Sequence, residues 1–167
     1  EPLANYHCHT GENPLWDDRR RCVFWTDIPA GRLFRWDYDT GEHRQVYGGE
    51  VVGGFTLQED GRLLLFGAGR IWIWDPDGGG ERTVAEDVDP DNIPRFNDVI
   101  ADPTGGVLAG TMGRTSESGG LFRLHVDGRI ECLFRGTGCS NGLAFAPDRR
   151  LLYWTDSTHK RIDVFDY

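Results

Sequence analysis

Several features of membrane, secreted and nucleic-acid-binding proteins are scarce in this sequence. It has no long apolar run and no signal-like stretch at its beginning, so no membrane partner is expected, although processing before Glu1 could have removed a leader. Lys and Arg together number 18 against 27 Asp and Glu, which gives a formal net charge of −9. Because phosphate binding requires a basic surface, this balance argues against nucleic acid as a partner.

Cysteine is also sparse and follows no metal-binding pattern. The four cysteines, Cys8, Cys22, Cys132 and Cys139, contain no Cys-x-x-Cys pair. Cys22 and Cys132 lie in strand-like sequence, where a buried thiol behaves as a small hydrophobic group. We therefore expect reduced, structural cysteines and a cytoplasmic location.

No stretch of the sequence shows sustained helical periodicity. The chain shows a repeated unit instead. Apolar strand-like segments open four units about 40 to 44 residues apart, the spacing of four-stranded propeller blades. Each opening is followed by a turn rich in Asp, Pro or Gly and then by a second apolar run. The openings lie at residues 14–17, 54–57, 97–100 and 141–144. The pattern predicts an all-β protein, a β-propeller of which this chain covers about three and a half to four blades.

A third strand in each unit alternates aromatic with other residues. The clearest example is the run Ile71-Trp72-Ile73-Trp74-Asp75. Such a period of two is typical of a half-buried strand. The four third strands are expected at residues 33–37, 71–75, 121–124 and 162–166.

The fourth unit stops at Tyr167, at the end of its third strand. At about 42 residues per blade, six blades would need roughly 250 residues, and even a closed ring of four needs the missing outer strand. We expect a single propeller domain over residues 1–167 that is truncated at its C-terminus. An alternative is a four-bladed ring in which residues 3–9 supply the missing strand.

Three polar residues stand at equivalent unit starts, and in a propeller such positions face the central channel. They are Glu12, Asn97 and Asn141. One carboxylate with amide oxygens is a hard-oxygen set that suits calcium or magnesium and tolerates manganese or zinc. Other interpretations are a solvated loop for Glu12 before Pro14 and turn positions for the asparagines. Arg95 is either one half of a surface ion pair or a fork of donors for an anionic or polyhydroxyl ligand.

The combined motifs resemble the gluconolactonase, regucalcin (senescence marker protein) and luciferin-regenerating-enzyme family, in the family's order and over nearly the whole chain. The resemblance implies a six-bladed β-propeller that binds one divalent metal in its channel and hydrolyses sugar lactones. The motifs are Gly11-Glu12-Asn13-Pro14-Leu15-Trp16, Trp25-Thr26-Asp27-Ile28, Arg95-Phe96-Asn97-Asp98, Ala109-Gly110-Thr111-Met112, Ser140-Asn141-Gly142-Leu143-Ala144 and Tyr153-Trp154-Thr155-Asp156-Ser157.

The resemblance also assigns roles to single residues. Glu12 and Asn141 match two metal ligands, with calcium as the first choice of metal and zinc, magnesium, manganese or iron as alternatives. Arg95 and Asn97 match positions that contact the lactone, and Glu117 is the one carboxylate in the loop where the family has an acidic substrate contact. Asp156 resembles an aspartate that supports the site. The family's third ligand, an aspartate thought to act as general base, has no counterpart up to Tyr167.

The predicted function is metal-dependent hydrolysis of sugar lactones to aldonic acids, with the activity of this chain alone left open. A serine route is disfavoured because no Gly-x-Ser-x-Gly elbow is present. The alternatives are a non-catalytic calcium-binding or protein-interaction propeller, or another activity in the same metal channel, such as a phosphotriesterase-like one. The expected partners are a small sugar lactone and a second polypeptide that completes the propeller.

Overall fold

Residues 2–167, the part of the chain that the computed structural model describes, form fifteen β-strands and no helix. The strands make four antiparallel sheets, which we call blades A to D in chain order. Blade A holds β1 (Gly11–Asp17), β2 (Cys22–Asp27), β3 (Arg32–Asp37) and β4 (His43–Gly48). Blade B holds β5 (Gly54–Leu57), β6 (Leu63–Phe66), β7 (Ile71–Trp74) and β8 (Glu81–Ala85). Blade C holds β9 (Arg95–Ala101), β10 (Val107–Met112), β11 (Gly119–Leu124) and β12 (Ile130–Thr137). Blade D holds β13 (Ser140–Phe145), β14 (Leu151–Asp156) and β15 (Arg161–Asp166).

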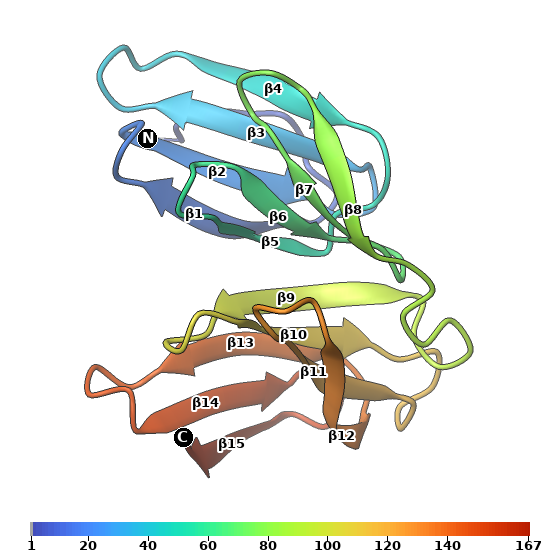
Figure 1. Cartoon of the computed structure of the whole chain (residues 1–167). Helices are drawn as coiled ribbons and strands as arrows, with labels where there is room; N and C mark the ends of the chain where they lie inside the picture. Colours follow the sequence, from blue (N-terminus) through green and yellow to red (C-terminus); the bar gives the residue numbers. More distant parts are fainter. Residues whose placement is uncertain (1) are drawn as a thin grey trace.

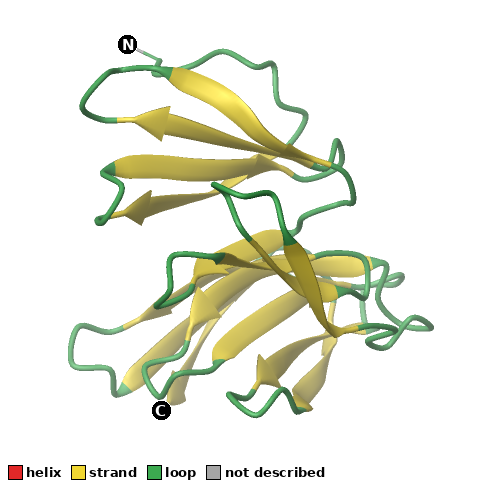
Figure 2. Cartoon of the chain, turned by 45° about the horizontal axis from the view of Figure 1, so that its top comes forward, coloured by secondary structure: helices red, strands yellow, loops and turns green. Residues whose placement is uncertain are grey.

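The first strand of each blade is its inner strand. Within every sheet the strands follow one another in chain order, and the inner strands of neighbouring blades, β1 and β5, β5 and β9, and β9 and β13, lie side by side. The blades follow one another from blade A, near the N-terminus, to blade D, which carries the C-terminus (Figures 1 and 2). This arrangement confirms the predicted all-β propeller, with three four-stranded blades and a fourth of three strands.

The alternative in which residues 3–9 complete blade D is wrong. No strand is formed over these residues, and β15 is the outermost strand of its sheet. Tyr6 instead stacks on Phe34 of blade A, with ring centroids 4.2 Å apart, and its hydroxyl hydrogen-bonds with the His43 ring at 2.7 Å. Aromatic stacking therefore holds this segment on the first blade rather than the last.

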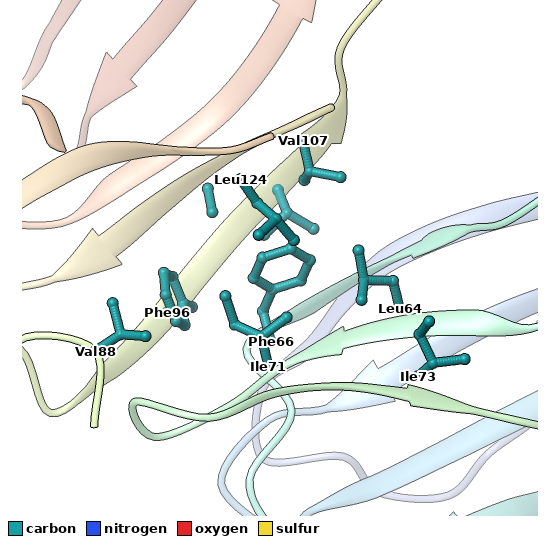
Figure 3. Close-up of a cluster of buried hydrophobic side chains, with 10 residues drawn as sticks. Leu64, Phe66, Ile71, Ile73, Val88, Phe96, Val107 and Leu124 are labelled. Carbon is teal, nitrogen blue, oxygen red and sulfur yellow. The ribbon is translucent and has the colours of Figure 1, made fainter. Parts of the chain in front are cut away.

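Three apolar clusters fill the three spaces between neighbouring blades. The cluster between blades A and B includes Phe24 and Trp72, and that between blades C and D includes Leu121 and Trp154. Figure 3 shows the middle cluster, where Phe66 of blade B meets Phe96 of blade C at a centroid distance of 5.4 Å. Burial of apolar area at these contacts is the main force that joins one blade to the next.

Blade B is buried on both faces, which corrects the expectation of a half-buried third strand there. Trp72 and Trp74 point toward blade A, whereas Ile71 and Ile73 point toward blade C. All four residues of β7 are buried. The alternation of tryptophan and isoleucine in this strand therefore places larger side chains in one apolar interface and smaller ones in the other. It does not alternate buried with exposed residues.

The cysteines form no disulfide among residues 2–167. Cys22 is fully buried in the cluster between blades A and B, as expected. Cys132 is exposed on the outer strand β12, so its predicted burial is wrong: an outer strand turns part of its surface to solvent. No helix in this part of the chain has the length and apolar character needed to cross a membrane.

Candidate functional site

Glu12 and Asn141 occupy equivalent bulges on the inner strands of blades A and D. Glu12 lies opposite Thr26, and the pairing then skips two residues before Leu15. Asn141 lies opposite Thr155, and the same skip follows before Ala144. The residues after them, Asn13 and Gly142, both have a φ of +54°, a left-handed conformation that Asn and Gly tolerate best. Because a bulge redirects the side chains around it, both residues leave the regular alternation of the strand.

Asn97 ties the inner strand of blade C to that of blade D. Its side chain is buried, its Nδ2 donates to the Ser140 carbonyl at 2.8 Å, and its Oδ1 accepts from Arg95 Nη1 at 2.6 Å. Arg95 Nη1 also donates to the Phe96 carbonyl at 3.0 Å. Both ends of the Asn97 amide are thus engaged within the protein, and the residue orients the Arg95 guanidinium.

The charge of Glu12 in blade A acts on Arg95 in blade C. Burial lowers the pKa of Arg95, and the neighbouring Glu12 opposes that shift. Burial raises the pKa of the Cys139 thiol, on which the charges of Arg95, Asp156 and Glu12 also act. The charges of Glu12 from blade A, Arg95 from blade C and Cys139 at the start of blade D thus act on one another.

The donor chemistry at Asn141 fits a hard cation. Its Nδ2 donates to Ser157 Oγ at 3.1 Å, which fixes the amide and leaves Oδ1 as the acceptor for a ligand. Glu12 adds an exposed carboxylate. A carboxylate and an amide oxygen are ligands that calcium and magnesium prefer. Among residues 2–167, three or more His, Cys, Asp or Glu side chains do not gather at any point in an arrangement suited to a metal.

Asp156 anchors the turn between β14 and β15 beside this region. Its carboxylate has no exposed area and accepts main-chain N–H groups of Gly138, Cys139 and Thr158 at 3.1 to 3.3 Å. Asp156 Oδ2 also lies 2.6 Å from His159 Nδ1. Burial alone would raise the pKa of Asp156, but the hydrogen bonds from His159 and the main chain lower it below its usual value.

Glu117 lies in the loop between β10 and β11, and its side chain is 68% exposed. Its Oε1 lies 3.1 Å from His159 Nε2, so a blade D side chain holds it. Glu117 and the Asn141 amide are thus supported by the same turn, through His159 and Ser157 respectively. The sequence reasoning assigned no role to His159 or Ser157, since each acts on a residue distant in the chain.

Asn13 and Asp98 belong to the sequence motifs but were assigned no role, and both join inner strands. Asn13 Oδ1 accepts the Phe55 N–H at 3.1 Å while its Nδ2 donates to the Phe55 carbonyl at 3.2 Å. Asp98 Oδ2 accepts the Leu143 N–H at 3.1 Å. The available signal was their place in the repeat, because Asn13 follows Glu12 as Asp98 follows Asn97.

Comparison with known proteins places this arrangement in a family. Residues 10–167 match the family described as the SMP-30/Gluconolactonase/LRE-like region. The chain belongs to this family. All four blades therefore lie within the SMP-30/gluconolactonase/LRE-like region.

Two relatives of the chain are named as lactonases. A pentonolactonase of Haloferax volcanii is 40% identical over 167 residues, which cover 99% of this chain and 56% of the relative. A 6-deoxy-6-sulfogluconolactonase of Pseudomonas putida is 35% identical over 149 residues, covering 88% of this chain and 51% of the relative. The chain thus spans about half the length of the curated relatives it matches.

A solved structure shares the fold. The calcium-binding protein regucalcin of Agrobacterium tumefaciens superposes with a TM-score of 0.85 at 23% sequence identity, over 94% of this chain and 54% of the solved chain. At that identity the likeness establishes the fold alone. The roles of Glu12, Asn141, Arg95, Asn97 and Glu117 toward metal or substrate stay predictions.

Proposed function

We propose that the whole protein hydrolyses sugar lactones to aldonic acids, and that this chain contributes part of the metal site and part of the substrate pocket. The observation that supports this proposal is the equivalent bulged placement of Glu12 and Asn141 on the inner strands of blades A and D, with the charge of Glu12 acting on Arg95. The names of the relatives, pentonolactonase and 6-deoxy-6-sulfogluconolactonase, support a lactone as the substrate class.

In the proposed site Glu12 and Asn141 Oδ1 hold one divalent cation, with calcium as the first choice and magnesium, manganese, zinc or iron as alternatives. A cation bound there supplies Lewis-acid polarisation of the lactone carbonyl. Ser157 keeps the Asn141 amide in the orientation that presents its oxygen. The regucalcin of Agrobacterium tumefaciens is a calcium-binding protein, which supports the choice of metal.

Arg95 would orient the sugar. Residues 2–167 provide protein partners for its Nη1 only, so the remaining N–H donors of the planar fork are left for a lactone's hydroxyl or carbonyl oxygens. Asn97 Oδ1 holds that fork by accepting from Arg95 Nη1, and Glu117 would accept a hydrogen bond from a sugar hydroxyl. Such fixed donors and acceptors raise the rate by holding the substrate in an attack geometry.

Metal binding is tested on the purified chain by titration calorimetry with calcium chloride. Glu12→Gln removes the ligand charge and is expected to weaken binding at least about tenfold. Glu59→Gln is the matched control, because Glu59 is exposed in a turn before β6. Equal calcium affinity in the two variants, or no binding by the wild type, would contradict the metal site.

Catalysis is tested on the whole protein with glucono- and pentonolactones, following acid release at constant pH. We expect hydrolysis that stops when the metal is chelated and returns when it is restored. Calcium binding without hydrolysis of any lactone would instead favour a non-catalytic calcium-binding protein. The predicted second polypeptide is checked by comparing native and denaturing masses, and the predicted cytoplasmic location by cell fractionation.

A further inference from the structure

One imidazole joins the turn of blade D to the loop of blade C at the rim of the candidate site. His159 follows β14, and its Nδ1 lies 2.6 Å from Asp156 Oδ2. Its Nε2 lies 3.1 Å from Oε1 of Glu117, which belongs to the loop between β10 and β11. A carboxylate therefore faces each ring nitrogen, one from each of two neighbouring blades.

The Asp156 end of this bridge is rigid. The Asp156 carboxylate is fully buried, and main-chain N–H groups of Gly138, Cys139 and Thr158 hold it in place. An ionised carboxylate only accepts hydrogen bonds, so His159 Nδ1 must carry a proton. The orientation of the imidazole is consequently set from blade D.

The hydrogen bond between His159 and Glu117 requires a second proton on the imidazole ring. Glu117 is also a carboxylate acceptor, so both hydrogen bonds form together only when His159 is an imidazolium. The hydrogen bond to Asp156 is the main cause of a raised pKa at His159, and Glu117 adds to it. Asp156 from blade D and Glu117 from blade C are the charged groups that face the ring. A neutral ring would keep its one N–H on buried Asp156 and lose the donor to Glu117.

The loop that carries Glu117 has other ties. The Gly113 N–H donates to the Gly138 carbonyl at 2.7 Å, in the connection between β12 and β13. Ser118 Oγ donates to the Asn92 carbonyl at 3.0 Å, and the Arg114 guanidinium donates to the Pro90 carbonyl at 3.2 Å. Both acceptors precede β9, on the side of the connection from blade B. Within residues 2–167, His159 provides the side-chain tie from the loop to blade D, where Asn141 is held.

We propose that His159 is a positioning residue that fixes Glu117, and with it residues 113–118, against blade D. The turn at residues 157–160 then sets two parts of the site at once, the Asn141 amide through Ser157 and the Glu117 carboxylate through His159. The consequence for sugar recognition rests on the proposed function, whereas the bridge itself does not. In the proposed site the fixed Glu117 carboxylate would accept a hydrogen bond from a hydroxyl group of the sugar lactone in a defined direction.

The first experiment is hydrogen exchange measured by mass spectrometry on the purified chain. His159→Ala is expected to speed exchange in residues 113–118 at least about threefold. His125→Ala is the matched control, since His125 also pairs with one carboxylate, Glu131 at 2.7 Å, but within the sheet of blade C. Unchanged exchange of residues 113–118 in His159→Ala would overturn the proposal.

A second measurement separates the bridge from general loss of structure. The imidazole signal of His159, followed by NMR during a pH titration, is expected to have a midpoint above that of a free histidine. Glu117→Gln is expected to lower this midpoint while leaving the unfolding temperature in place, because Glu117 is exposed. A midpoint that Glu117→Gln does not move would show that the bridge is absent in solution.

The activity measurement then tests the consequence for the site. In the whole protein, His159→Ala and Glu117→Gln are each expected to raise KM for a lactone several-fold more than they lower kcat, and the double variant to add little to either. Additive effects would contradict positioning through Glu117. If the whole protein hydrolyses no lactone, the proposed function fails, while exchange and titration still decide whether the bridge exists.

Discussion

The side chain of Asp98 accepts a hydrogen bond from the main-chain N–H of Leu143 at 3.1 Å and so joins the inner strands of blades C and D. The same carboxylate accepts the N–H of Val99 at 2.9 Å. Asn13 joins blades A and B in the same way, because its side chain hydrogen-bonds with the main chain of Phe55. Polar side chains next to the site residues thus help to hold the blades in the arrangement that the site needs.

Removal of this contact is expected to destabilise the chain. Asp98→Ala leaves the Leu143 N–H without its partner and should lower the free energy of unfolding by about 1–3 kcal/mol. Urea unfolding at neutral pH measures the change. The exposed residue Asp166 provides a control, since Asp166→Ala should alter stability by less than about 0.5 kcal/mol.

The Asp98 carboxyl should also give the chain a distinct pH dependence. Burial raises the pKa of Asp98, and main-chain hydrogen bonds offset part of the shift. A carboxyl with a raised folded pKa binds its proton more tightly in the folded state, so its contribution is complete below the unfolded pKa and is lost as pH rises through the folded pKa. Unfolding free energies measured across that range should therefore fall less with rising pH in Asp98→Ala than in the wild type.

Asp156 predicts the opposite dependence. Its pKa is lowered, because the hydrogen bonds from His159 and the main chain outweigh burial. Its contribution is present above the unfolded pKa of about 4 and is lost as pH falls through the folded pKa. Asp156→Asn should lose less stability than the wild type when urea unfolding is compared at about pH 7 and about pH 3. An equal acid-induced loss in both proteins would contradict this assignment.

Gly110 of blade C lies directly against Ser140 of blade D. A β-carbon added there would come within 1.9 Å of Ser140 Oγ, the atom that accepts the Trp154 indole N–H. Gly110→Ala should lower the free energy of unfolding by about 1–3 kcal/mol through overpacking. Gly80→Ala, at a site where an added β-carbon meets nothing within 4 Å, is the matched control. Comparable unfolding curves for the two variants would rule out the steric argument.

Arg95 offers a direct test of substrate recognition in the whole protein. Arg95→Ala should raise KM for a lactone by at least about tenfold, since a charged donor fork is lost from the pocket. Arg149→Ala, which changes an exposed arginine in the turn before β14, should leave both kinetic constants unchanged. Unaltered KM and kcat in Arg95→Ala would remove Arg95 from the site.

Thiol accessibility checks the corrected account of the cysteines. Cys132 is exposed, with its thiol 3.6 Å from the Phe134 carbonyl, whereas Cys22 is fully buried. A maleimide reagent should label Cys132 in the native protein and Cys22 only after unfolding, as peptide mass mapping would reveal. Labelling of Cys22 at the native rate of Cys132 would mean that the interface between blades A and B is open.

The sequence by itself determined the repeat, the all-β class and the equivalence of Glu12 with Asn141. These properties depend on the linear order of residues, because turn residues, strand alternation and unit spacing are all visible in the sequence. The strands observed at Ile71–Trp74 and Arg161–Asp166 begin and end within a residue of the predicted segments.

Only the tertiary structure decided which strand faces are buried and which polar groups form hydrogen bonds with one another. Burial of β7 on both faces depends on blades A and C, and the exposure of Cys132 depends on its outer strand. The contacts of Asn97 with Ser140 and of Glu117 with His159 join residues more than 40 positions apart. No local period encodes such pairs, because they exist only once apolar burial has brought separate blades together.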